Sequence, residues 1–152
     1  MAYDIPTTPC EDPAETIMAA VAHGMSGNPA LGLSLLGPFI EEGARTTVSM
    51  CAALASMVAV AAEKQHPAAG TFGFIAIHHG YPTNVAALPP GPRFAAQFTA
   101  AWLNGQQQTA YALFHALTFQ ERDEDAANLA EGVLALYELA VESALSLRGG
   151  DS

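Results

Sequence analysis

The stretch TTVSMCAALASMVAVAA, residues 46–62, decides the fold class. It carries no charged residue, and its apolar side chains recur at steps of three and four residues, which is typical of a helix. Pro38 suits a first helical position, and Pro67 disfavours a helical residue before it. We therefore predict one long helix that begins near Pro38 and ends at Gln65 or His66.

The predicted long helix has two apolar sides. One side is the expected core stripe, which consists of Ile40, Ala44, Val48, Cys51, Ala55, Val58 and Ala62. The other side carries a narrow polar line, made of Glu42, Ser49, Ser56 and Glu63. Apolar residues flank that line, and four of them are called the predicted apolar face: Met50, Ala53, Met57 and Val60. A helix that is apolar around most of its circumference is buried on more than one side, so we expect this face to contact a protein partner or a second copy of the chain.

The other helices are indicated by their start and stop signals. Asp12 and Pro13 suit an N-cap and a first helical position, and we expect the helix that they start to end at His23-Gly24. Similar signals predict helices over about 93–103, 106–118 and 124–148. The sequence thus predicts an all-α fold, a single bundle of about five helices around one long central helix, without an internal repeat.

Three further segments complete the predicted domain organisation. Residues 1–11 form a flexible N-terminal tail, 12–148 the single helical domain, and 149–152 a disordered C-terminus. Within the domain, residues 67–92 are rich in proline and glycine and break the helical pattern. We expect this irregular segment to cross the bundle, with room for one short strand.

Composition restricts the partners that the chain can bind. Its 152 residues are 51% hydrophobic and 13% charged, which fits one globular domain with an ordinary core. The net charge is −10, from 15 acidic and 5 basic residues. That charge repels a nucleic-acid backbone, so we expect no direct nucleic-acid binding and favour a protein partner with a basic surface.

The N-terminal residues and the apolar stretch bear on location. The first 13 residues hold no basic segment and no apolar run, so we expect no secretory signal and place the protein in the cytoplasm. Residues 46–62 just reach the lower length limit of a membrane-spanning helix. Their hydroxyl side chains and alanines make the stretch weakly apolar, and no cluster of Lys and Arg flanks it. We therefore expect no membrane interaction.

Two groups of residues were considered as metal or catalytic sites. The stretch FGFIAIHHGYP, 72–82, contains His78 and His79, whose side chains point to opposite faces of an extended segment and so cannot bind one metal together. Glu63 and His66 share a helix face as half of a di-iron carboxylate motif, but the chain has no second copy. These four residues are weak metal candidates, and we expect neither a cofactor nor a catalytic residue.

The acidic connection before the last helix is a second candidate contact. Glu121, Asp123, Glu124 and Asp125 form a local negative patch. Acidic residues are also expected in the first turn of a helix, where they favour the helix dipole. The patch is read as helix capping or as a docking site for a basic partner.

The sequence favours a non-enzymatic function without settling it. The first hypothesis is an acidic helical interaction protein that acts by protein–protein binding or self-assembly, as an inhibitor, an adaptor or an assembly subunit. One alternative is a small metal-binding or hydrolytic enzyme that uses His66, His78 or His79 with helix-borne carboxylates. Another is a bundle that binds a small apolar ligand in a pocket lined by aromatic residues, namely Phe94, Phe98, Trp102, Tyr111 and Phe114.

Overall fold

A computed structural model describes residues 13–65, 76–78, 81–83, 88–118 and 123–150. The elements in chain order are α1 (Pro13–Met25), α2 (Pro29–Glu42), α3 (Ala44–Gln65), β1 (Ala76–His78), β2 (Tyr81–Thr83), α4 (Pro90–Leu103), α5 (Gln107–Thr118) and α6 (Asp123–Gly150). The two short strands pair antiparallel, with Ile77 opposite Pro82. The all-α prediction is confirmed, and the described residues form six helices rather than about five.

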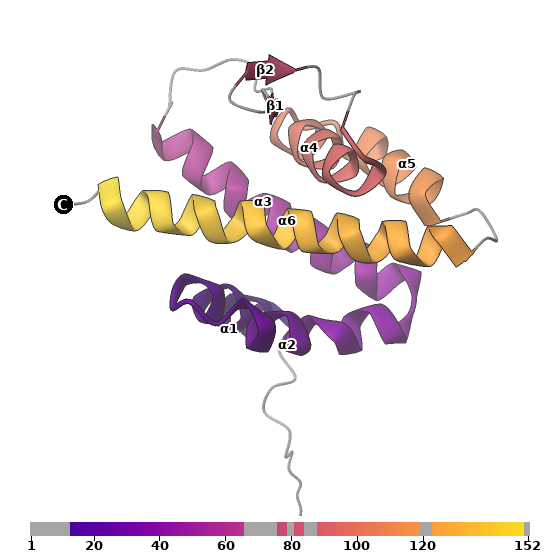
Figure 1. Ribbon diagram of the computed structural model, residues 1–152, viewed down its shortest axis with the longest axis horizontal. Coiled ribbons are helices and arrows are strands. Elements are labelled where there is room, and N and C mark those ends of the chain that lie inside the picture. The colour runs from indigo at the N-terminus through magenta and orange to yellow at the C-terminus, as the bar shows by residue number, and fades with distance from the viewer. Residues whose placement is uncertain (1–12, 66–75, 79–80, 84–87, 119–122, 151–152) are drawn as a thin grey trace, which may run out of the picture.

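The helices are arranged as two hairpins on either side of a central pair. Figure 1 shows α1 and α2 together below, α4 and α5 together above, and α3 and α6 crossing between them. Both central helices contact each other, and both contact α1 and α4. They run in the same direction in this view, from right to left. The order of a hairpin followed by a long helix therefore occurs twice along the chain, although the sequence gives no sign of a repeat.

The turns of the two hairpins are built alike. Two residues after the end of each first helix lies a glycine with positive φ, Gly27 at 87° and Gly105 at 74°, a conformation that costs glycine little. The backbone N–H after that glycine reaches back five residues, from Asn28 to His23 and from Gln106 to Ala101, at 2.8 Å in both cases. This is the Schellman pattern, which satisfies the free carbonyls at a helix end and turns the chain back.

The predicted long helix is wrong at its start. Pro38 lies inside α2, and the break falls five residues later at Gly43, whose φ is 125°. Across this break, the buried hydroxyl of Thr47 donates to the carbonyl of Gly43 at 2.7 Å and lies 3.3 Å from that of Phe39. Those contacts link the end of α2 to the first turn of α3. The longest helix is consequently α6, with 28 residues, and not the helix that contains residues 46–62.

The first hairpin packs against α6 around one tyrosine. The hydroxyl of Tyr137 in α6 donates to the carbonyl of Ala20 in α1 at 2.6 Å, and the side chain is almost fully buried. Glycines let the helices approach it, because a Cβ atom at Gly24 or Gly32 would contact this hydroxyl. Burial raises the pKa of Tyr137 above its ordinary value, and a backbone hydrogen bond at Gly24 opposes part of that rise.

Candidate functional site

The predicted apolar face is only partly at the surface. Met50 is 1% exposed and belongs to the core, whereas Val60 is 49% exposed. Between them, Ala53 and Met57 are half-buried and pack against the core cluster. Met50 is covered because α1 and α2 both contact α3 in addition to α6 and α4. Sequence periodicity cannot assign those neighbours to particular turns of the helix.

Most candidate metal and acidic residues fall where the structure gives no side-chain placement. His66, His79 and Glu121 lie outside the described residues. His78 lies in β1, and Asp123, Glu124 and Asp125 occupy the first turn of α6, but their side chains are not described either. Glu63 is exposed near the end of α3. In the part of the chain that the structure describes, no three His, Cys, Asp or Glu residues gather as a metal site would require.

Cys51 is the described cysteine, and its thiol is free and buried within α3. Burial raises the pKa of this thiol from 9.0 to about 12, since the apolar surroundings disfavour a thiolate. A catalytic or redox-active cysteine needs the opposite shift, toward the thiolate at neutral pH. Cys51 is therefore a small core residue, as the sequence predicts.

The aromatic residues proposed as a pocket lining contact one another in a row. Phe98 and Phe114 are fully buried, and the ring of Phe94 lies 5.3 Å from Phe98 and 6.4 Å from Phe114 between centroids. Trp102 stacks on Phe98 at 6.1 Å, and Tyr111 meets the Trp102 ring edge-on. The indole N–H of Trp102 donates to the hydroxyl of Ser56 at 2.9 Å, which connects α4 with α3.

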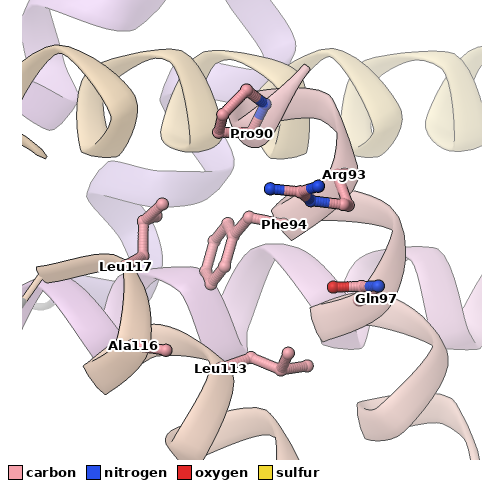
Figure 2. Close-up of a pocket in the computed structure, with 7 residues that line it drawn as sticks. All are labelled: Pro90, Arg93, Phe94, Gln97, Leu113, Ala116 and Leu117. Atoms are coloured by element: carbon pink, nitrogen blue, oxygen red, sulfur yellow. The ribbon is translucent and has the colours of Figure 1, made fainter. Parts of the chain in front are cut away.

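A small hollow lies beside this aromatic row, between the start of α4 and the end of α5. We call it the C-terminal hollow; it has a volume of about 140 Å³ and is lined by Pro90, Arg93, Phe94, Gln97, Leu113, Ala116 and Leu117. Figure 2 shows Phe94 between the two helices, with Arg93 and Gln97 extending from α4 on the same side. Of the five aromatic residues that the sequence suggested, Phe94 alone lines it.

A larger hollow lies in the first half of the molecule, between the start of α1, the end of α2 and the first turns of α3. We call it the N-terminal hollow; it has a volume of about 350 Å³ and is lined by Pro13, Ala14, Ile17, Phe39, Arg45, Thr46, Ser49, Met50 and Ala53. Two members of the predicted apolar face, Met50 and Ala53, thus form part of a concave wall.

Sequence reasoning missed both hollows. Their linings combine residues from two or three helices, and nothing in the spacing of those residues along the chain brings them together. The small number of basic residues was the one feature of the composition that bears on the hollows. Only five residues of the chain are basic, and two of them, Arg45 and Arg93, each lie in a hollow whose other lining residues carry no formal charge.

One helix in the described residues is long and apolar enough to cross a membrane, judged by length and composition alone. It spans Ala44–Lys64, and 39% of the residues in its most apolar 18-residue stretch are buried inside the fold. Core helices of soluble proteins share this composition. In this structure α3 contacts four other helices, so part of its apolar surface has protein neighbours.

No protein-family model, curated protein or solved structure matches the chain.

Proposed function

We propose that the protein is a cytoplasmic, non-enzymatic interaction protein, which binds another protein or a second copy of itself through the outer side of α3. One observation carries the proposal. Although α3 contacts four helices, 39% of the residues in its most apolar stretch are buried, most of the others are half-buried, and Val60 is 49% exposed. No charged residue occurs from 46 to 62, so the uncovered part of this helix offers water apolar atoms and a few hydroxyl groups. Covering such a surface is favourable.

The centre of the proposed contact is the group Ala53, Met57 and Val60. Steps of four and three residues place these side chains on one face of a helix. Val60 is the most exposed of the three, and the other two are half-buried behind it. A partner helix that packs along this line would cover all three at once, as helices do in ridge-into-groove packing.

The acidic residues 121–125 are a proposed second contact, for a basic partner. Asp123, Glu124 and Asp125 fall at the start of α6, and the chain carries a net charge of −10. Complementary charge accelerates association and adds specificity more than affinity. A contact of this kind would weaken as salt screens it, whereas the apolar contact on α3 would not.

Self-association is the mode to test first, by light scattering coupled to size-exclusion chromatography at low and high salt. We expect an assembly whose mass does not fall at high salt. Val60→Glu places a carboxylate at the centre of the contact and should shift the protein to monomer. Leu134→Glu is the matched control, because Leu134 is a similarly exposed apolar residue on a different helix, α6.

A monomer at all protein concentrations would contradict the self-associating form of the proposal. Equal behaviour of the Val60→Glu and Leu134→Glu variants would contradict the assignment of the contact to α3. Circular dichroism of both variants serves as the check that each remains folded.

A further inference from the structure

The N-terminal hollow has an apolar floor. Ile17 of α1, Phe39 of α2 and Met50 of α3 line it, and all three side chains belong to the hydrophobic core. Only small parts of these side chains face the hollow, since Ile17 is 4%, Phe39 9% and Met50 1% exposed. Hydrocarbon placed in the hollow would contact those parts and the apolar side chains of Pro13, Ala14 and Ala53.

The polar groups of this hollow lie together on α3. Arg45 and Ser49 are exposed and Thr46 is half-buried, and all three belong to the first two turns of that helix. Arg45 is the one charged residue among the nine that line the hollow; Glu41 and Glu42, at the end of α2, are not among them. A ligand in this hollow therefore meets apolar surface on one side and a guanidinium with two hydroxyl groups on the other.

We propose that the N-terminal hollow is a binding site for a small amphipathic carboxylate, a free fatty acid of medium chain length. The hydrocarbon chain lies on the floor formed by Ile17, Phe39 and Met50. The carboxylate pairs with Arg45, whose planar guanidinium suits bidentate contact with two oxygens. The hydroxyl groups of Thr46 and Ser49 are further donors within the same lining.

The dimensions of the hollow fit this class of ligand. Its volume of about 350 Å³ falls within the range of about 300–1,000 Å³ that is usual for small-molecule sites. Its lining extends along α3 from Arg45 to Ala53, a span of eight helical steps, or about 12 Å at the helical rise of about 1.5 Å per residue. An extended medium-length hydrocarbon chain covers that distance.

The C-terminal hollow does not offer the same site. Its volume of about 140 Å³ is well below that range. Arg93 is half-buried and takes part in a further interaction within the chain, whereas Arg45 is exposed. Each hollow contains one arginine, but only the N-terminal hollow has the volume of a small-molecule site.

The test is a titration of the protein with sodium decanoate below its micelle concentration, followed by calorimetry and by NMR of the methyl groups. Binding should shift the methyl signals of Ile17 and Met50 and leave those of Leu113 and Leu117, in the other hollow, unchanged. Decylamine has the same chain with a cationic head and should bind at least tenfold more weakly. Equal affinity for the two compounds, or shifts confined to other residues, would overturn the proposal.

Variants separate the charge from the cavity. Arg45→Gln should lower the decanoate affinity about tenfold, and Ala53→Leu should weaken it by filling the hollow while Arg45 remains. Arg148→Gln is the matched control, because it removes the same charge from the last turn of α6, away from the lining. An unchanged affinity in Arg45→Gln would contradict the role of the arginine even if decanoate binds.

The site shares Ala53 with the proposed association contact on α3, but the two proposals are tested by different measurements. Decanoate binding is read on the N-terminal hollow, and association is read from the mass in solution. A protein that binds decanoate as a monomer would support the site and count against self-association. A protein that self-associates but does not bind decanoate would support the association and overturn the site.

Discussion

The two halves of the molecule, α1–α3 and α4–α6, follow the same path but pack their hairpins by different means. In the first half, small residues bring the helices close together, and Ala20 and Gly32 meet the hydroxyl of Tyr137. In the second half, the phenyl rings of Phe94 and Phe98 fill the space with tilted contacts. The two halves have equivalent turns, but the first half is packed by close approach of its helix backbones and the second by large aromatic side chains.

The difference shows how the halves depend on each other. Tyr137 belongs to the second half and donates its hydrogen bond to α1 in the first. In return, Ser56 in the first half accepts the hydrogen bond of Trp102 in the second. Because each half supplies a buried or half-buried polar partner to the other, we expect the chain to unfold as one cooperative unit.

The largest expected effect comes from adding a methyl group at Gly32, in the first half. A Cβ atom at Gly32 would collide with the Tyr137 hydroxyl and with the backbone carbonyl of Ala20, neither of which can move aside easily. We expect Gly32→Ala to cost about 2 kcal/mol or more of unfolding free energy, which is typical of overpacking. Urea unfolding followed by circular dichroism measures it.

The matched variant in the second half is Gly132→Ala. Its Cβ atom would lie 2.9 Å from a Phe94 ring carbon and 3.3 Å from a Leu117 methyl, both of them side-chain atoms. Helix propensity favours alanine over glycine by about 1 kcal/mol at either position. We therefore expect Gly132→Ala to change stability by less than about 1 kcal/mol. Equal costs at Gly32 and Gly132 would contradict the distinction between the two interiors.

A smaller effect is expected at the tyrosine that joins the halves. Tyr137→Phe removes a buried hydrogen bond and should cost about 1 kcal/mol at neutral pH. The raised pKa of Tyr137 predicts that its contribution is complete below about pH 10, the ordinary value, and is lost as the pH rises further, since the unfolded chain releases the proton first. The wild-type protein should thus lose more stability between pH 9 and pH 11 than the variant does.

Cys51 is the internal reference for that comparison. Its pKa of about 12, raised from 9.0, also makes the fold less stable at alkaline pH, but it does so in the wild-type protein and in Tyr137→Phe alike. Parallel losses of stability in the two proteins would show that the phenol does not ionise differently in the folded and unfolded chains.

The smallest expected effect lies in the second half, at Thr99. This residue is fully buried in α4, and its hydroxyl is the one buried side-chain oxygen without a hydrogen-bond partner among the described residues. Thr99→Val replaces the hydroxyl by a methyl of similar size and should leave stability unchanged or raise it by up to about 1 kcal/mol. A loss above 1 kcal/mol in a melting experiment would mean that the hydroxyl has a partner.

Several elements could be predicted from the sequence because local chemistry decides them. The predicted end of the helix over about 93–103 is confirmed: α4 ends at Leu103, and Gly105, two residues later, is in the left-handed region. The signal at Gly24 was misleading, since α1 continues to Met25 and the left-handed residue is Gly27. A Cβ atom at Gly24 would lie 2.6 Å from the hydroxyl oxygen of Tyr137. Because Tyr137 is more than a hundred residues away along the chain, the sequence around Gly24 does not show this packing role.

The candidate surface was harder to predict than the helices. Periodicity placed Met50 and Val60 on one apolar face, but α1 and α2 cover the first and leave the second exposed. Which turns of α3 are covered depends on where the first hairpin ends, and that depends on the break at Gly43 rather than at Pro38. The hollows depend on the same long-range placement.

The hydrogen bond between Trp102 and Ser56 has a practical consequence. Trp102 is the single tryptophan of the chain, half-buried, stacked on Phe98 and bonded across the boundary between the halves. Its fluorescence is therefore a built-in reporter of that boundary, requiring no label. A red shift of its emission that precedes the loss of helix would reveal the halves separating before they unfold, while coincident signals would identify a single transition.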